Sequence, residues 1–132
     1  MAKKKLLYVA PHLSTGGQPQ YLYKQIKEFI SDFNIEVVEI NNSGGNAFVV
    51  QKNRIKELVP VHTLSDDKSE VLNIIENFKP DIIHFQEIPQ FDLAPFILDK
   101  IFSKEREYFI LATTHGSFTN PSEITYQPDR YV

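Results

Sequence analysis

Short, nearly continuous apolar runs alternate along this chain with longer segments in which apolar residues recur every third or fourth position. Continuous runs are typical of parallel strands that are buried on both faces, because neither face then needs polar residues. Recurrence at helical spacing is typical of a helix with one buried face. The pattern predicts strands at residues 6–10, 35–40, 61–64, 81–85 and 108–113, and helices at residues 19–33, 52–59, 67–79 and 92–106.

Three of the predicted helix boundaries carry recognisable signals. Pro19 suits the first helical position, where its missing N–H costs nothing. Asp67 and Glu70 are the acidic residues that cap the first N–H groups of a helix, and this role explains the Asp66-Asp67 pair better than a metal site does. Pro80 ends the same helix, because its ring cannot continue the hydrogen-bond ladder.

Strands and helices that alternate at this spacing predict right-handed crossovers and an α/β fold with a doubly wound, mainly parallel, Rossmann-like sheet. Such sheets bind ligands beyond the carboxyl ends of their strands. Polar residues follow the predicted first, fourth and fifth strands, at residues 14–18, 86–87 and 115–117. We therefore expect these three groups to gather at one edge of the sheet.

The predicted helix at residues 92–106 is apolar around much of its circumference, with Pro95 in its first turn. Two interpretations are open. The helix either packs between the sheet and its neighbours, or presents a surface to a membrane or a lipid acceptor.

Composition narrows the classes of function. The 132 residues predict a single soluble domain, with 42% hydrophobic and 23% charged residues, and no apolar stretch is long enough to cross a membrane. A net charge of -3 argues against a nucleic-acid partner. The absence of cysteine excludes disulfides and thiol chemistry and agrees with a reducing, cytoplasmic location. The four histidines lack the spacing of metal ligands, so no metal cofactor is expected.

The loop before the first helix contains Gly16 and Gly17, which allow positive φ or a close approach to a ligand. It lacks the Lys-Ser/Thr of a phosphate-binding P-loop and the third glycine of a dinucleotide motif, so a plain turn and a ligand-binding loop both remain open. His115 follows a buried strand and is a candidate functional residue at the rim, whereas His84 is expected to be a buried, hydrogen-bonded histidine. Glu87 is the carboxylate best placed to act as a general base, although a solvated strand-end glutamate is an equal alternative.

The last residues predict an interrupted fold. Residues 120–128 have the composition of a loop, and residues 129–132 resemble the beginning of a further strand. We expect the chain to be part of a longer protein, with the truncation near residues 118–132.

Three motifs, in this order, resemble the N-terminal domain of retaining glycosyltransferases of family 4, which have two Rossmann-like domains in the GT-B fold. They are Leu6-Leu7-Tyr8-Val9 followed by His12-Leu13-Ser14-Thr15-Gly16-Gly17, then Lys79-Pro80-Asp81-Ile82-Ile83-His84-Phe85, then Thr113-Thr114-His115-Gly116-Ser117. The resemblance covers nearly the whole chain. It departs from the family pattern at Gln86, where many relatives carry a histidine.

The resemblance implies roles for individual residues. Gly16 and Gly17 would lie against the diphosphate of a nucleotide-sugar donor, and His115 beside the donor sugar, with Gly116 and Ser117 next to it. Glu87 would face the acceptor. The second domain of the family, which binds most of the nucleotide, has no counterpart in residues 1–132, so this single acceptor-side domain would be inactive alone.

The function implied is transfer of a hexosyl group from a nucleotide sugar to a glycan, a lipid-linked acceptor or a small molecule. The expected partners are donor, acceptor and the missing C-terminal domain, with contact to the inner face of a membrane as a further candidate. The alternatives are a stand-alone nucleotide- or phosphate-binding module and a flavodoxin-like interaction domain.

Overall fold

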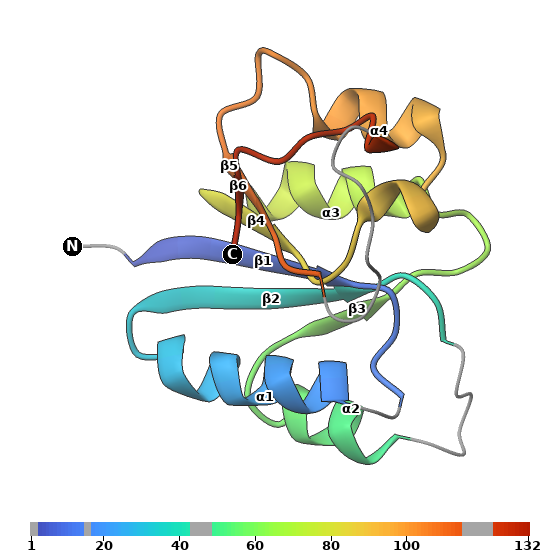
Figure 1. Ribbon diagram of the computed structural model, residues 1–132. Coiled ribbons are helices and arrows are strands. Elements are labelled where there is room, and N and C mark those ends of the chain that lie inside the picture. The colour runs from blue at the N-terminus through green and yellow to red at the C-terminus, as the bar shows by residue number, and fades with distance from the viewer. Residues whose placement is uncertain (1–2, 15–16, 43–48, 115–122) are drawn as a thin grey trace.

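The computed structural model describes residues 3–14, 17–42, 49–114 and 123–132 (Figure 1). A sheet of parallel strands forms its centre, and helices lie on both faces of the sheet. The elements, in chain order, are β1 (Lys4–Ala10), α1 (Gly17–Phe29), β2 (Phe33–Glu39), α2 (Val50–Lys56), β3 (Val61–Thr63), α3 (Glu70–Phe78), β4 (Ile82–Phe85), the 3₁₀ turn η1 (Pro89–Phe91), α4 (Pro95–Ile101), β5 (Phe109–Ala112) and β6 (Arg130–Tyr131).

The strand order is β3-β2-β1-β4-β5-β6, and every neighbouring pair is parallel. This order confirms the predicted Rossmann-like α/β fold. The chain grows outward from β1 in one direction through β2 and β3, and then returns to start again at β4 on the other side. β1 and β4 therefore flank the point at which the direction of growth reverses.

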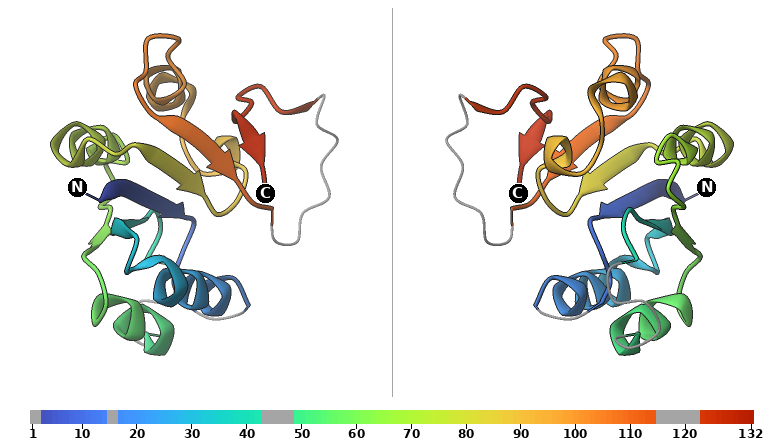
Figure 2. Two further views of the ribbon diagram at one scale, coloured as in Figure 1. Left: turned by 90° about the vertical axis from the view of Figure 1, so that its left-hand side faces the viewer. Right: turned by 90° about the vertical axis from the view of Figure 1, so that its right-hand side faces the viewer.

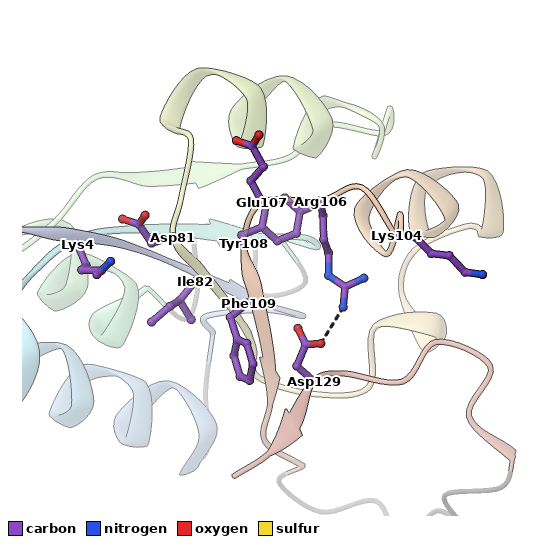
Figure 3. A pocket seen from close by; sticks show the side chains of 9 residues that line it. All are labelled: Lys4, Asp81, Ile82, Lys104, Arg106, Glu107, Tyr108, Phe109 and Asp129. Atoms are coloured by element: carbon purple, nitrogen blue, oxygen red, sulfur yellow. Dashed lines mark hydrogen bonds and ion pairs between the residues drawn. The ribbon is translucent and has the colours of Figure 1, made fainter.

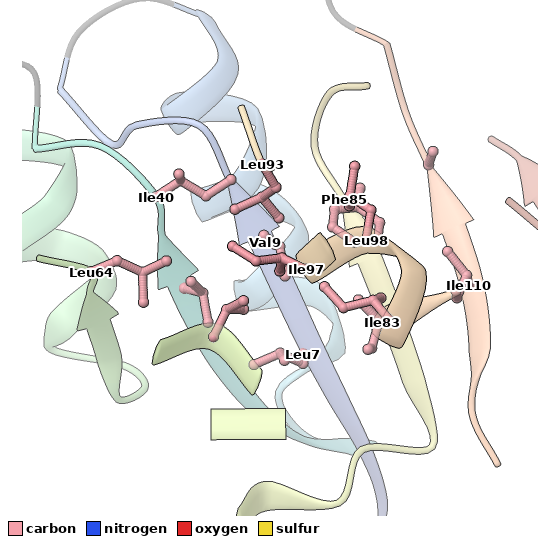
Figure 4. Packing of buried hydrophobic residues seen from close by; sticks show 14 residues of the cluster. Leu7, Val9, Ile40, Leu64, Ile83, Phe85, Leu93, Ile97, Leu98 and Ile110 are labelled. Atoms are coloured by element: carbon pink, nitrogen blue, oxygen red, sulfur yellow. The ribbon is translucent and has the colours of Figure 1, made fainter. Parts of the chain in front are cut away.

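Two hydrophobic clusters hold the layers together, one on each face of the sheet. Successive residues of β1 alternate between them: Leu7 and Val9 pack with α3 and α4, whereas Leu6 and Tyr8 pack with α1 and α2. The first cluster is drawn in Figure 4. Because both faces are covered at β1, its residues 6–10 are all buried, which explains the continuous apolar run in the sequence.

The first helix is shorter than its apolar spacing predicts. α1 ends at Phe29, and Phe33 is the first residue of β2. The two rings meet edge to face, with centroids 6.2 Å apart and planes at 88°. Phe33 thus joins the same hydrophobic cluster from a different element, and its helical spacing from Phe29 is coincidental.

The prediction of one helix over residues 92–106 is wrong at both ends. Residues 92–94 are non-helical and follow the turn η1, and α4 starts only at Pro95, whose missing N–H suits a first helical position. After the helix, the hydroxyl of Tyr108 donates to the carbonyl of Ile101 at 2.6 Å, and Arg106 Nη1 donates to the carbonyl of Ser103 at 3.0 Å. These side chains satisfy carbonyls at the end of the helix, so the chain can turn towards β5 there.

α4 packs one face on the sheet and exposes another. Ile97, Leu98 and Ile101 are buried, whereas the side chain of Phe96 is 61% exposed. The helix therefore appears apolar all round because it combines a core face with one exposed aromatic residue. Within the part of the chain that the structure describes, no helix is both long and apolar enough to cross a membrane.

The prediction that Asp67 and Glu70 cap the helix is wrong in detail, because the N-cap residue of α3 is Ser69 and it makes no side-chain cap hydrogen bond. The two acidic residues instead bind main-chain N–H groups of the preceding turn. Asp67 Oδ1 accepts the N–H of Ser69 at 3.1 Å, and Glu70 Oε1 accepts the N–H of Ser65 at 2.8 Å. Their carboxylates thus hold the turn that leads into α3.

Candidate functional site at the carboxyl edge of the sheet

The end of β4 and the start of α1 meet at the carboxyl edge of the sheet. Gln18, in the first turn of α1, donates a hydrogen bond from Nε2 to the main-chain oxygen of Gln86, 2.5 Å away. The N–H of Gln86 in turn donates to the carbonyl of Val9 in β1, at 2.8 Å. Two of the three polar groups expected at this edge are therefore in direct contact, beside the point where the strand order reverses.

Gly17 is exposed and is the first residue of α1. Its φ is outside the left-handed region, so of the two possibilities stated for the glycines only the close approach of a ligand applies to Gly17. A Cβ added to it would meet no described heavy atom within 4 Å. Open space in front of the backbone and a first turn without acidic side chains leave room for an anion beside the helix N–H groups.

A histidine and a serine fold back on each other in the loop between β1 and α1. His12 Nδ1 lies 2.9 Å from Ser14 Oγ, and the N–H of Ser14 donates to the same nitrogen at 3.3 Å. Because Nδ1 accepts the main-chain N–H of Ser14, this nitrogen carries no hydrogen of its own. The hydroxyl of Ser14 must therefore also donate to Nδ1. The contact fixes the shape of the loop immediately before the glycines.

Glu87 and Asp92 place two carboxylates after β4. Glu87 is half-buried, and its Oε1 lies 3.3 Å from the N–H of Ile88. The pKa of Asp92 is raised, first by burial and then by the negative charge of Glu87, while His12 opposes the shift. Asp92 is thus close enough to both His12 and Glu87 to feel their charges, and its carboxyl can accept hydrogen bonds from hydroxyl groups.

Glu39, at the end of β2, is the centre of a buried polar cluster. It is 1% exposed, its Oε2 accepts the N–H of Leu13 at 2.8 Å, and its Oε1 accepts the hydroxyl of Thr63 at 2.9 Å. Lys52 Nζ, from α2, lies 2.7 Å from Oε1. One carboxylate therefore ties the loop after β1 to β3 and α2.

Main-chain hydrogen bonds also hold the loop after β1 against the end of β2. The N–H groups of Ile40 and Asn41 donate to the carbonyls of Ala10 and Pro11, at 2.9 and 2.8 Å. Lys68 Nζ donates to the carbonyl of Ile40 at 2.7 Å. The loop that leads to Gly17 is therefore held at successive positions before it reaches the helix.

The sequence did not single out Glu39 or Asp92 as parts of the site. The only sign of Glu39 was an acidic residue between two apolar ones at the end of a strand, a position that also suits a solvated side chain. Asp92 was interpreted as the beginning of a helix, whereas it directly follows η1, and its pKa is raised by burial and then by the charge of Glu87. The contacts of both residues come from segments distant in the chain.

His84 is buried, as expected of a hydrogen-bonded core histidine. It is 5% exposed, and its Nε2 lies 2.7 Å from Thr113 Oγ1. Its ring is tilted by 30° against that of Tyr8, with centroids 5.3 Å apart. Among the described residues, no group of three or more acidic or histidine side chains is arranged to hold a metal ion. Asp67 is instead bonded to Ser69.

The amino ends of the strands form a separate hollow of about 790 Å³ (Figure 3). Three of its charged side chains, Asp81, Arg106 and Asp129, hold neighbouring segments of the fold together. Asp81 accepts the N–H of Lys5 at 2.8 Å, and Asp129 binds Arg106 at 2.9 Å and the N–H of Ile110 at 2.7 Å. We therefore place the candidate site at the carboxyl edge, although this hollow is larger than the groove described below.

Several predicted site residues lie outside the described residues: Gly16, His115, Gly116 and Ser117. Their predicted roles stay predictions. Of the predicted set, the structure describes Gly17 and Glu87, which belong to the segments joined by Gln18 and Gln86.

Comparison with known proteins adds no assignment. No protein-family model matches the chain. No curated protein matches it significantly.

Proposed function

We propose that this chain is the N-terminal, acceptor-side domain of a retaining glycosyltransferase that transfers a hexosyl group from a nucleotide sugar to a glycan, lipid-linked or small-molecule acceptor. The three sequence motifs that resemble glycosyltransferase family 4 motivate the proposal. The Rossmann-like order of parallel strands supports it, because each half of that two-domain architecture requires such a sheet.

The contact between Gln18 and Gln86 is the observation that carries the proposal. It brings the start of α1 and the segment after β4 together at the reversal of strand order, where open α/β sheets bind their ligands. A donor diphosphate at the exposed backbone of Gly17 and an acceptor near Glu87 would then lie on neighbouring parts of one edge.

Binding and orientation are the chemistry proposed for these residues. The N–H groups at the start of α1 stabilise the departing diphosphate, since a helix N-terminus attracts negative charge. Glu87 orients an acceptor hydroxyl, and His115 steadies the donor sugar. A second domain closes the cleft and supplies the remaining contacts to the nucleotide, so the isolated chain binds weakly and transfers little.

Location belongs to the same proposal. We place the enzyme in the cytoplasm, in keeping with a chain that has no cysteine. The exposed side chains of Phe91 and Phe96 offer a place for contact with the inner face of a membrane when the acceptor is lipid-linked.

Amide NMR of the isotopically labelled chain, titrated with a panel of nucleotide-diphosphate sugars, tests the proposal. We expect weak, saturable shifts of Gly17, Gln18 and Glu87. Gly17→Ala should abolish the shifts while leaving the fold intact, because the added methyl group occupies the open approach to the backbone but no protein atom opposes it. Gln20→Ala, on the exposed side of the same helix, is the matched control and should bind as the parent does.

The other outcomes separate the alternatives. Tight binding of a free nucleotide or inorganic phosphate, equal to that of the sugar donors, would favour a stand-alone nucleotide- or phosphate-binding module. A folded chain whose edge residues respond to no donor, even with a glycosyltransferase C-terminal domain supplied, would favour an interaction domain.

A further inference from the structure

α1 and α2 cover only part of the sheet face on which they lie. α1 and α2 lie over the β1, β2 and β3 side, whereas no helix of the described residues lies over β4, β5 and β6 on that face (Figure 2). α3 and α4 lie on the opposite face. Parallel sheets in α/β proteins normally have both faces covered, so this bare half of the face has room for a further helix.

A groove of about 200 Å³ runs along the boundary between the covered and bare halves. Its floor contains Ile82 and His84 from β4 and Leu111 from β5, and its wall contains Gln25 and Phe29 from α1. Apart from the amide and imidazole groups, these surfaces are apolar. Strands lie about 4.8 Å apart and packed helices 8–10 Å apart, so a helix laid beside α1 would cover the width of β4 and β5.

One wall of the groove contains a polar atom that needs a hydrogen-bond donor. Gln25 Nε2 donates to the hydroxyl of Tyr21 at 2.7 Å, but Gln25 Oε1 is buried and has no hydrogen-bond partner among the described residues. A buried acceptor without a partner is costly. A ligand that brings an N–H or O–H to this point would remove the cost.

The two flanks of the groove carry opposite charges. Glu28 lies one turn beyond Gln25 on the same side of α1, and its charge contributes to the raised pKa of Tyr8, after burial and Tyr21. Arg130, in β6, pairs with Leu111 and therefore points to the same face of the sheet. Both residues are exposed, and neither forms an ion pair with another described residue.

We propose that this groove docks an amphipathic α-helix of a partner polypeptide. The apolar stripe of that helix covers Ile82 and Leu111, a basic side chain on one flank faces Glu28, and an acidic side chain on the other faces Arg130. A polar side chain next to the stripe donates to Gln25 Oε1. This inference is independent of the proposed transferase, since the groove lies on a face of the sheet and not at its carboxyl edge.

Two synthetic peptides of the same composition test the proposal. Each is a helical peptide of about 18 residues, long enough to retain helical structure, with a leucine stripe flanked by lysines and glutamates. In the matched peptide the lysines lie on the α1 side, and in the isomer the two flanks are exchanged. Binding is measured by amide NMR at Gln25, Ile82 and Leu111 and by fluorescence anisotropy.

We expect the matched peptide to bind about tenfold more tightly than the isomer, because exchange of the flanks turns two attractive pairs into repulsive ones. The paired substitution Glu28→Lys and Arg130→Glu should invert this preference. Both sites are exposed, so the exchange is not expected to affect folding. Leu111→Glu should abolish binding of both peptides, whereas Phe96→Glu, on the opposite face, should leave it unchanged.

Three results would overturn the proposal. The first is equal binding of the two peptides, or a preference that the charge exchange does not invert. The second is a concentration-dependent dimer in sedimentation experiments that Leu111→Glu dissociates, since the groove would then hold a second copy of this chain. The third is saturable binding of a small aromatic probe such as indole at the same amides with no response to either peptide.

Discussion

Lys52 Nζ and Glu39 Oε1 lie 2.7 Å apart, and their side chains are 12% and 2% exposed. The pair joins α2 to the end of β2. Because Glu39 also accepts the N–H of Leu13 and the hydroxyl of Thr63, the charge is compensated on several sides. The loop before Gly17 therefore depends on a carboxylate that belongs to the neighbouring strand.

We expect Lys52→Met to destabilise the protein by about 3 kcal/mol, since it leaves a buried carboxylate without its cation. Glu39→Gln should cost less, about 1–2 kcal/mol, because the amide oxygen can still accept the hydroxyl of Thr63 and Lys52 can reach solvent, although the amide NH2 then replaces the acceptor of the Leu13 N–H. The double variant should lose less free energy of unfolding than the two single variants lose together. Urea unfolding of all three gives the coupling energy, expected to be about 1–3 kcal/mol.

Lys56→Met, on an exposed position of the same helix, is the control and should change the free energy of unfolding by less than about 0.5 kcal/mol. Additive effects of Glu39→Gln and Lys52→Met would show that the pair contributes nothing beyond its separate members.

The raised pKa of Asp92 implies that the free energy of unfolding depends on pH. Burial and the charge of Glu87 raise the pKa of Asp92 in the folded protein. Because the pKa is higher in the folded protein than in the unfolded chain, folding favours the protonated carboxyl. The contribution of Asp92 to the free energy of unfolding is therefore fully present below the pKa of the unfolded chain and is lost as pH rises through the pKa of the folded protein. We expect Asp92→Asn to gain stability relative to the parent over that interval, modestly because half of the carboxyl is solvated.

Urea unfolding from pH 3 to pH 7, in steps of about half a unit around the ordinary Asp range, measures this gain. Asp66→Asn is the control, since Asp66 is an exposed carboxylate on another loop. A gain that shrinks as pH rises would contradict the assigned direction.

The hydroxyl of Thr113 is expected to fix the ring of His84. Thr113→Val keeps the shape of the side chain but removes the oxygen 2.7 Å from Nε2, at a cost of about 1 kcal/mol in the free energy of unfolding. It should also shift the ring nitrogen signals of His84 in long-range ¹⁵N NMR. Thr113→Ser retains the hydroxyl and should keep those signals, even though loss of the methyl group weakens packing.

Lys79 is the described non-glycine residue with positive φ, at φ 53° and ψ 62°, where it ends α3. Glycine adopts this conformation without the steric cost that a Cβ imposes, so Lys79→Gly should raise the free energy of unfolding by about 0.5–1 kcal/mol. Asn73→Gly, at an exposed position inside the same helix, should instead lower it. Thermal unfolding of the two variants compares them directly, and destabilisation by both would argue against a left-handed cap.

The positions of the strands along the chain could be predicted from the sequence, because a strand buried on both faces requires a continuous apolar run wherever it lies. The runs around Val9, Ile83 and Ile110 are such cases, and each is buried. Helix ends were less predictable. Phe33 continued the spacing of α1 but belongs to β2, since the same apolar side chain can join the same cluster from either element.

The apolar pattern thus predicted the alternation of strands and helices, the parallel sheet that follows from it, and the edge where polar loops gather. Which polar groups meet at that edge became clear only from the folded arrangement of the segments. Gln18 reaches Gln86, and Glu39 reaches Leu13 and Lys52, across separations that no local pattern encodes. The reason is physical: burial of apolar runs is a property of each segment, whereas a hydrogen bond or ion pair depends on the relative placement of two segments after folding.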